Sequence, residues 1–453
     1  MNVPATAKAP VPLKGGWPLL GHTVPFVRDT LGLLERTHDE CGMVGTFRLV
    51  NKDIALFSGP AAHEAVFRAP DEQLSPNAAY KMMVPVFGKG VVYDCEPARM
   101  GEQLGMLRPA LQGRRMKFYG DIVAAETRQA LEPWGDDGVA DLYGFAQQLT
   151  NYTSSHCLLG TEFRNEMSAE FAQVYHDLER GIVPVGYIHP YLPIPAFKRR
   201  DRARARLGEM VGEIVARRRA SGFRGEDFLQ TLMESAYADG SRLTDHEIAG
   251  MLIAAMFAGH HTSGSTTAWT ILELLRDGRF LAEVVEEIDR VFPPGEEVSL
   301  DLKTMRELEK TEWAVKEALR LHPPLFILLR EAQEDLELAG YRIRKGTWVA
   351  VSPWVAHRDS EVFRDATTYD PRRFDETRAE DAQPFAYIAF GGGRHKCLGN
   401  AFALLQIKTI VAILLRQYRF ELYGDELADD FGSLVIGPKM PCRVRYTRRE
   451  HGA

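Results

Sequence analysis

The sequence predicts a mainly helical α+β protein, and three features of the chain lead to this class. Its middle, roughly residues 100–320, has the apolar spacing of helices and few prolines. Alternating apolar and polar residues at 44–58 and 336–351 predict short antiparallel strands near the two ends. No linker, repeat or low-complexity stretch divides the 453 residues. We therefore expect one domain over residues 1–453, with a small β-containing lobe at about 15–70 and a helical body, rather than alternating β and α units.

Both strand regions have turn residues where a hairpin needs them. The first region runs from Val44 to Ser58 and the second from Leu336 to Val351. The expected turns are Asn51-Lys52 in the first region, and Ala339-Gly340 and Lys345-Gly346 in the second. We expect a β-hairpin in each region.

One helix is predicted with unusual clarity. Thr244 and Glu247 fit a capping box, and helical sequence follows as far as Asp277-Gly278. About 33 residues give a helix roughly 50 Å long. Its segment 251–258 is apolar on all sides, so we expect it to be buried all round. The polar segment Gly-His-His-Thr-Ser-Gly that follows, 259–264, is unexpected in a core helix and points to a function.

The net charge limits the class of binding partner that we expect, and the cysteine content limits the cellular compartment. A formal net charge of -7 argues against nucleic acid as the main partner. Five scattered cysteines, an odd number, do not fit a disulfide framework and favour a reducing compartment. Neither the Pro- and Gly-rich N-terminus nor any internal run is apolar for long enough to act as a signal or a membrane span. We therefore expect a soluble, cytoplasmic protein without a transmembrane anchor.

Cys397 stands in the most informative motif, the segment 390–399, which reads Phe-Gly-Gly-Gly-Arg-His-Lys-Cys-Leu-Gly. The three glycines allow the backbone to approach something flat or large, and backbone amides can bond to the sulfur. A helical pattern starts at Asn400, so its positive end would stabilise a thiolate. Arg394, His395 and Lys396 add positive charge. The remaining cysteines are interpreted as inert small hydrophobic residues: Cys41, Cys95, Cys157 and Cys442.

A thiolate presented in this way suits either a nucleophile or a metal ligand. As a nucleophile it would need a base, for which His395 is a candidate. Zinc would need three or four clustered ligands, and the chain has neither C-x-x-C nor H-E-x-x-H. Haem iron needs only one protein sulfur. The residues thus leave a cysteine hydrolase and a haem protein as alternatives.

The cysteine segment resembles the F-G-x-G-R-x-x-C-x-G signature of cytochromes P450. Glu317 and Arg320 match the family's E-x-x-R motif, and Arg373 belongs to a Pro-Arg-Arg-Phe match at 371–374. The resemblance spans about residues 15–447 and implies a triangular, helix-rich fold whose long central helix lies over haem b. It further implies that Cys397 ligates the iron within a loop begun by Phe390 and Gly391. Glu317, Arg320 and Arg373 would then form a structural ion-pair network.

Finer motifs resemble the bacterial soluble type of sterol 14α-demethylase. Segment 257–263, Phe-Ala-Gly-His-His-Thr-Ser, is similar to their A-G-x-H-T-S pattern, and 80–94 and 187–203 are similar to two further signatures. The resemblance implies that Thr262, His261 and Glu179 deliver protons. Tyr80, Arg330 and His395 would bind the haem propionates. The family's substrate positions are held by Tyr80, Met82, Met83, Phe87, Tyr93, Phe257, Ala258, Leu325, Phe326, Ile327, Leu434 and Val435.

Three positions depart from the pattern of the sterol enzymes. Gly101 replaces a basic residue, for which Arg99 is a possible substitute. Met82 stands where the family has phenylalanine or leucine, and Phe326 is bulkier than the usual aliphatic residue. A larger side chain over the haem could exclude a sterol.

The resemblance implies a monooxygenase that uses dioxygen to oxidise a bulky hydrophobic substrate, a sterol that loses its 14α-methyl group. No flavin or nicotinamide domain is present, so we expect electrons to come from NAD(P)H through a ferredoxin and its reductase. We expect the chain itself to be a monomer. Two alternatives stay open. One is a P450 of the same lineage acting on a non-sterol lipid, terpenoid or natural-product intermediate. The other is a haem protein that binds ligands without catalysis.

Overall fold

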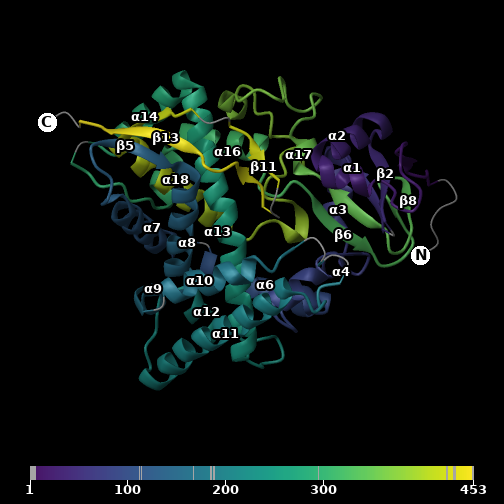
Figure 1. Ribbon diagram of the computed structural model, residues 1–453, viewed down its shortest axis with the longest axis horizontal. Helices are drawn as coiled ribbons and strands as arrows, with labels where there is room; N and C mark the ends of the chain where they lie inside the picture. Colours follow the sequence, from purple (N-terminus) through teal and green to yellow (C-terminus); the bar gives the residue numbers. More distant parts are fainter. Residues whose placement is uncertain are drawn as a thin grey trace. The chain divides into compact units, whose positions relative to one another are not determined.

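The computed structural model describes residues 7–450 except 51, 112, 114, 167, 184–185, 187–188, 294, 425–426 and 432–434. The chain forms two compact units, one from the described parts of 1–80 and 319–397 and one from those of 81–318 and 398–453. Figure 1 follows the chain through both units. The first unit contains most of the strands and the second most of the helices, as expected for a mainly helical α+β protein.

A six-stranded sheet in the order β1-β2-β3-β9-β6-β4 organises the first unit. The predicted hairpin at 44–58 is confirmed, since β2 and β3 pair antiparallel from Val44–Phe57 to Leu49–Lys52. The predicted turn at Asn51-Lys52 is not, because Lys52 already begins β3, and Asn51 lies outside the described residues. The second region is split. β7 and β8 pair as predicted, but β9 joins β3 and β6 in the large sheet, because three of its four residues are buried. The strands are β1 (Val11–Pro12), β2 (Val44–Leu49), β3 (Lys52–Phe57), β4 (Leu74–Ser75), β6 (Leu328–Ala332), β7 (Leu336–Leu338), β8 (Tyr341–Ile343) and β9 (Trp348–Val351).

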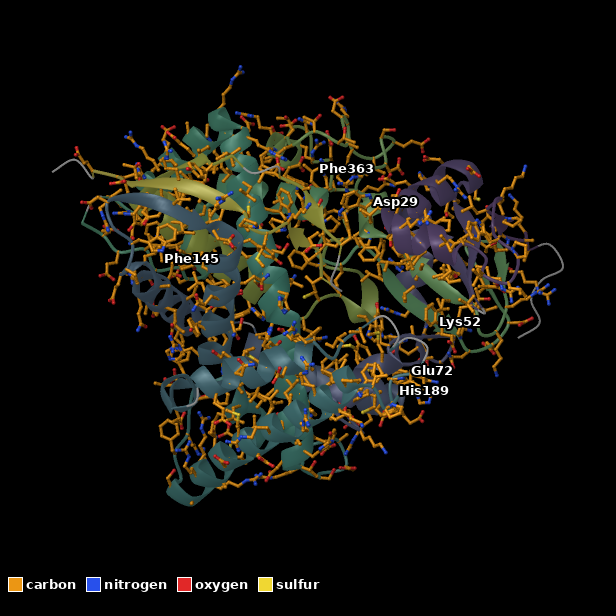
Figure 2. The ribbon with its side chains drawn as sticks, viewed as in Figure 1. Asp29, Lys52, Glu72, Phe145, His189 and Phe363 are labelled. Carbon is orange, nitrogen blue, oxygen red and sulfur yellow. The ribbon has the colours of Figure 1, made fainter. Side chains whose placement is uncertain are left out.

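Short helices surround this sheet. The Asp29 carboxylate, labelled in Figure 2, accepts a hydrogen bond from the amide of Gly32 at 2.9 Å and thereby caps α2. Phe57, Phe67 and Val349 belong to the apolar core of the unit. Its helices are α1 (Thr23–Arg28), α2 (Thr30–Cys41), α3 (Pro60–Arg68), α4 (Pro76–Ala79) and α17 (Pro353–Ala356), with the 3-10 turns η5 (Pro371–Phe374) and η6 (Gly393–His395).

Two fully buried arginines tie the loops of the first unit together. Arg320 donates to the carbonyl of His357 at 2.6 Å and to that of Thr368 at 3.1 Å. Arg373 donates to the same Thr368 carbonyl at 3.1 Å and pairs with Glu380 at 2.6 Å. Glu317, in the same helix as Arg320, is fully buried as well. The predicted trio therefore lies in the core, and Glu380 is a carboxylate that the motifs did not indicate.

We expect Glu380→Gln to destabilise the protein by about 3 kcal/mol at neutral pH, because it removes a charged partner from the fully buried Arg373. Burial would raise the pKa of Glu380, yet hydrogen bonds from Arg378 and Arg373 lower it. A lowered pKa in the folded state means that this stabilisation is present above the unfolded pKa of about 4.3 and is lost as pH falls through the folded pKa. Urea unfolding of wild type and variant at pH 7 and near pH 4 checks this.

The exposed Glu376, four residues earlier, provides the control for this substitution. Glu376→Gln should leave the unfolding midpoint almost unchanged at both pH values. A Glu380→Gln deficit that is the same at pH 7 and near pH 4 would contradict the assignment of this carboxylate as the ionised partner.

The second unit is built from helices around α13. α16 (Glu309–Leu321) runs from this unit into the first. The other helices are α5 (Val84–Phe87), α6 (Pro97–Leu107), α7 (Arg115–Leu131), α8 (Leu142–Leu159), α9 (Thr161–Glu166), α10 (Ser168–Glu179), α11 (Pro195–Ser221), α12 (Phe228–Glu234), α13 (Asp245–Arg276), α14 (Gly278–Val291), α15 (Leu302–Glu307) and α18 (Asn400–Gln417), with 3-10 turns η1 (Lys81–Met83), η2 (Val92–Asp94) and η3 (Arg108–Leu111).

Small sheets complete the second unit. β13 pairs antiparallel with both β10 and β5, and β11 pairs with β12. Phe145, labelled in Figure 2, packs on Trp134 with ring centroids 4.9 Å apart beside this sheet. The strands are β5 (Asp137–Asp141), β10 (Tyr418–Leu422), β11 (Asp429–Asp430), β12 (Gly437–Pro438) and β13 (Arg443–Arg448). Among the described residues, no helix combines the length and the apolar character that crossing a bilayer requires.

Helix α13 begins and ends as predicted. It has 32 residues, and Thr244 and Glu247 form both hydrogen bonds of the capping box. The prediction that 251–258 is buried on every side is wrong. Ala258 is exposed, and Ala254, Ala255, Phe257 and Thr262 are only partly buried. These residues recur at helical spacing, so α13 has one open, mostly apolar stripe.

Candidate functional site

Cys397 lies in a compact loop of the first unit. Its amide donates to the carbonyl of Phe390 at 2.9 Å, which closes the loop, and the residue is exposed. Along the chain α18 begins at Asn400, three residues later. The positive end of a helix dipole close to a sulfur favours its thiolate form. The loop thus presents one accessible sulfur ligand.

Two glycines of this loop allow a close approach to a different neighbour from the one predicted. A Cβ at Gly393 would lie 2.0 Å from the carbonyl oxygen of Phe67, and one at Gly392 would lie 2.8 Å from the Phe67 ring. Gly393 also has a φ of +61°, which disfavours other residues. The tight approach that we expected toward a flat group is therefore, at these two positions, packing against α3. Gly391, with a φ of +66°, has only ordinary contacts.

Two of the predicted propionate-binding residues meet at Leu329. The hydroxyl of Tyr80 accepts from the amide of Leu329 at 3.1 Å, and Arg330 donates to the Leu329 carbonyl at 2.8 Å. His395 has a different partner, since its Nε2 lies 2.7 Å from the buried carboxylate of Asp71. Asp71 orients this imidazole, which leaves Nδ1 as the nitrogen for any other ligand.

Three of the other cysteines, Cys41, Cys95 and Cys157, have environments that keep their thiols protonated. Burial raises the pKa of Cys95 to about 11, and burial raises the pKa of Cys157 well above its ordinary value. The pKa of Cys41 is also raised, chiefly by burial and then by Glu40. A neutral thiol is a poor nucleophile and a poor metal ligand. The setting of Cys397, exposed and followed by a helix, is different.

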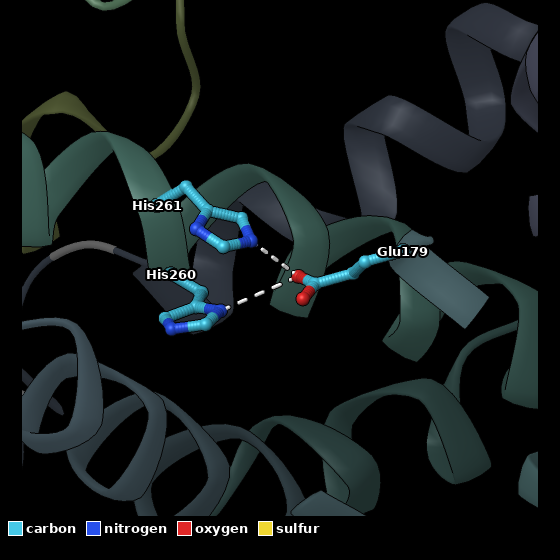
Figure 3. Close-up of side chains that lie close together, drawn as sticks. All are labelled: Glu179, His260 and His261. Atoms are coloured by element: carbon cyan, nitrogen blue, oxygen red, sulfur yellow. Dashed lines mark hydrogen bonds and ion pairs between the residues drawn. The ribbon is translucent and has the colours of Figure 1, made fainter. Parts of the chain in front are cut away.

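His261 and Glu179 lie together in the second unit, as Figure 3 shows. His261 Nε2 is 2.5 Å from Glu179 Oε1, and its Nδ1 is 2.9 Å from Gln147 Oε1. One residue further along α13, Thr262 donates its hydroxyl to the carbonyl of Ala258 at 2.7 Å, on the open stripe. α13 thus presents His261, paired with the carboxylate of Glu179 from α10, next to an accessible hydroxyl.

Packing between α8 and α13 holds this arrangement. A Cβ at Gly264 would lie 3.0 Å from Thr150 Oγ1 and 3.1 Å from Gln147 Cδ, so α8 approaches α13 closely there. A Cβ at Gly259 would meet only Ser154 Oγ at 3.6 Å, an ordinary contact. Of the two glycines that bracket the polar segment, Gly264 is therefore the one required by close packing.

The charge states in this cluster follow from burial and contact. Burial alone would raise the pKa of Glu179, but the imidazoles of His260 and His261 face its carboxylate and lower the pKa to about 2. The pKa of His260 is lowered, first because burial disfavours its charged form. Glu179 is therefore ionised and His260 neutral at neutral pH.

Several predicted substrate residues form an aromatic cluster in the second unit. Phe87 stacks on Tyr93 at 6.0 Å and meets Phe257 edge-on at 6.2 Å. Met82 and Met83 are buried in η1 nearby in the chain. Val435 is buried and Ala258 is exposed on α13, whereas Leu434 lies outside the described residues.

The other predicted substrate residues belong to the first unit. Leu325 is 40% exposed, and Phe326 and Ile327 are partly buried. The carbonyl of Phe326 accepts from the hydroxyl of Ser352 at 2.7 Å, which holds this segment beside β9 and α17. Their apolar side chains are therefore only partly covered by protein.

Arg99, the possible substitute for the basic residue missing at Gly101, has partners of its own in this structure. Its guanidinium lies 2.9 Å from the centroid of the Tyr237 ring and 3.6 Å from the Asp239 carboxylate. Gly101 is exposed, and a Cβ there would have no neighbour within 4 Å. Space for a longer side chain exists at position 101, but Arg99 is directed elsewhere.

Three residues of the site had no signal in the sequence. Gln147 contacts both histidines, Asp71 fixes His395, and the fully buried Gln103 accepts from the amide of Val92 at 2.8 Å. Val92 has a φ of +47°, a strained conformation for a β-branched residue, beside the aromatic cluster. Each is an ordinary polar residue whose partner is distant in the chain, so only the fold identifies it.

The residues present fit a haem group. One accessible sulfur at a helix start is the donor that a haem iron takes from a protein, and no second clustered ligand is needed. Tyr80, Arg330 and His395 are polar side chains that could bind the propionates. The open stripe of α13 supplies a surface with one hydroxyl, at Thr262, and otherwise mostly small or apolar side chains.

Comparison with known proteins gives the family. The family model "Cytochrome P450" matches residues 10–441. A sterol 14alpha-demethylase of Mycolicibacterium vanbaalenii is 43% identical over 452 residues, covering 98% of this chain and 99% of that protein. A sterol 14-demethylase of Arabidopsis thaliana is 39% identical over 98% of this chain and 92% of that protein. A lanosterol 14-alpha demethylase of Bos taurus is 36% identical over 99% of this chain and 89% of that protein.

The fold agrees with these sequence relationships. The solved structure of a retinoic acid-bound cyanobacterial CYP120A1 matches with a TM-score of 0.85, covering 98% of this chain and 100% of that one, at 24% identity. The chain belongs to the cytochrome P450 family of haem-dependent monooxygenases.

Proposed function

We propose that the protein oxidises a sterol, or a polycyclic terpenoid of similar shape, and removes a 14α-methyl group as sterol 14α-demethylases do. The observation that carries the proposal is the 2.5 Å contact of His261 with Glu179, one residue before the accessible hydroxyl of Thr262. Relatives named as sterol demethylases, at 36–43% identity over nearly the whole chain, support it. The cluster of Phe87, Tyr93 and Phe257 offers the aromatic surface that a bulky apolar ligand needs.

Haem, when bound, would supply the iron that activates dioxygen. Cys397 would hold that iron through its sulfur, within the loop that Phe390 and Gly391 begin, and Tyr80, Arg330 and His395 would bind the propionates. Within the second unit, the buried Met82, Met83 and Val435 would exclude water around the substrate, together with the aromatic cluster and Ala258.

The chain's own part in the chemistry is proton delivery. Glu179 is ionised, so His261 holds a proton at Nε2 against it. From there a proton passes by way of water to the hydroxyl of Thr262, which donates to Ala258 and can accept a hydrogen bond in turn. Thr262 then presents a proton on the open stripe of α13.

Electrons would come from NAD(P)H through a ferredoxin and its reductase. Arg394 and Lys396 are both exposed in the cysteine loop. An acidic ferredoxin would find complementary charge there, and its association would weaken as salt rises.

A spectral titration tests the substrate. Lanosterol-type sterols added to the haem-loaded protein should shift its Soret band to shorter wavelength and should make reductant consumption substrate-dependent in the presence of dioxygen. A shift without reductant consumption would instead indicate a protein that only binds ligands.

A second substrate class is favoured by Met82 and Phe326, which depart from the sterol enzymes. If sterols give neither shift nor turnover while terpenoids or other bulky lipids give both, the sterol assignment is overturned. Phe326→Leu is the matched variant. It should restore sterol binding if the bulk of Phe326 excludes the ring system.

A further inference from the structure

Glu179, His260 and His261 bring three ligand atoms of different side chains together, a group called here the Glu–His–His cluster. Their ligand atoms all lie within 4.8 Å of one another (Figure 3). His261 Nε2 is 2.5 Å and His260 Nδ1 3.5 Å from the same oxygen, Glu179 Oε1. Proton delivery as proposed above uses His261 and Glu179 and leaves His260 without a role.

His260 presents an unused lone pair to the carboxylate. Its Nε2 lies 3.0 Å from the carbonyl oxygen of Gln147, which can only accept, so Nε2 carries the hydrogen. Nδ1 of the neutral ring is then an acceptor. It has no hydrogen-bond partner among the described residues, although the side chain is only 8% exposed. A carboxylate also only accepts, so two acceptors face each other while His260 is neutral, and either a proton or a metal cation between them satisfies both.

Gln147 orients both rings in the way that ligands of a metal are usually oriented. Its carbonyl holds Nε2 of His260, and its side-chain oxygen lies 2.9 Å from Nδ1 of His261. Metal-bound histidines typically donate their second ring nitrogen to such an acceptor, which fixes the tautomer and the ring plane. The outward nitrogens, Nδ1 of His260 and Nε2 of His261, are the two that point at Glu179.

We propose that the Glu–His–His cluster binds one divalent transition-metal ion of the zinc class. Two imidazoles and one carboxylate are a common zinc donor set that keeps a fourth position for water. Tetrahedral ligation at 2.0–2.1 Å places ligand atoms roughly 3.3 Å apart. The 3.5 Å separation already fits, and the 2.5 Å separation must widen by roughly 0.8 Å as the ion replaces the proton on His261 Nε2.

Bound zinc would stop proton delivery. The ion takes the nitrogen of His261 that holds the proton and neutralises the carboxylate that keeps it there. This consequence rests on the proposed function, whereas binding of the ion does not. Zinc bound there would inhibit turnover without competing with the substrate.

Isothermal calorimetry with zinc chloride on the haem-loaded protein, purified without a polyhistidine tag, tests binding. We expect one equivalent to bind. His260→Phe should weaken zinc binding at least tenfold. Losing a direct ligand costs more affinity than losing an outer partner of a ligand, which itself costs roughly 10–100-fold. His176→Ala removes an exposed imidazole from α10 one turn before Glu179 and should leave binding and activity unchanged. Equal zinc affinity in wild type and His260→Phe would overturn the proposal.

X-ray absorption at the zinc edge of the loaded wild type needs no variant and should show two imidazoles and an oxygen ligand near 2.0 Å. Glu179→Gln keeps the shape of the side chain and should weaken zinc binding as His260→Phe does. It therefore tests the same site even if His260→Phe fails to fold. A spectrum that shows only water oxygens around the zinc, with no imidazole ligand, would overturn the site.

Zinc should also lower substrate-dependent reductant consumption of wild type with no change in the substrate's spectral affinity. Binding without inhibition would overturn the inhibitory role and the proton path through His261. The sterol titration involves no zinc, so its failure would remove only the substrate assignment.

Discussion

Cys397→Ser should abolish the red-shifted absorption band of the reduced, carbon monoxide-treated protein and should abolish turnover. The band reports a thiolate bound to haem iron. A serine hydroxyl has nearly the same size but stays protonated near neutral pH, so it cannot donate the same charge. The loop itself should survive, because its closing bond joins the amide of residue 397 to the carbonyl of Phe390 and does not use the sulfur.

Cys41→Ser is the matched control for this prediction. Cys41 is a partly buried thiol in the last turn of α2, with a raised pKa. This variant should keep the band and the activity. Difference spectra of both variants after reduction, with the haem content measured independently, check the result. A red-shifted band that persists in Cys397→Ser would falsify the assignment of the iron ligand.

The parts of the fold that were predicted correctly have local causes. The hairpin β2–β3 follows from two short apolar-rich runs close together in the chain with polar residues between them, and the limits of α13 follow from the capping box at Thr244 and the break after Arg276. Such signals lie within a few residues of the structure that they specify. The pairing of β9 does not, since its partners β3 and β6 are set by which strand buries its apolar residues.

The errors concern surfaces whose neighbour is distant in the chain. The apolar composition of 251–258 predicted burial all round, but composition cannot distinguish contact with protein from an apolar face left open, as at Ala258. The glycines at 392 and 393 correctly indicated a close approach. Their neighbour turned out to be Phe67, more than three hundred residues away in sequence.

The site was predictable only as far as its motifs extend. Cys397 is identified by its own segment. The pairing of His261 with Glu179 came from family resemblance, since no local motif around Glu179 predicts it. Gln147 went unnoticed because an amide in a helix has no distinctive pattern. Its importance arises only where α8 places it against both histidines of α13.

His261→Ala should slow turnover roughly 100-fold, the lower end of the effect of a positioned proton donor. The substrate's spectral dissociation constant should change less than twofold, because the imidazole contacts Gln147 and Glu179 and is not part of the aromatic cluster. His246→Ala is the matched control. It removes an exposed histidine from the first turn of the same helix and should leave turnover unchanged, although its contact with the Lys89 carbonyl, near Phe87, makes the spectral affinity the weaker part of the control.

Steady-state turnover and spectral titration on the same preparations separate the two effects. Glu179→Gln should also slow turnover, because the neutral amide no longer stabilises the proton on His261. Its effect combined with His261→Ala should be much less than the product of the single effects, since both variants interrupt one path. If His261→Ala turns over as fast as wild type, protons reach Thr262 by another route, and the contact between His261 and Glu179 serves only to hold α10 against α13.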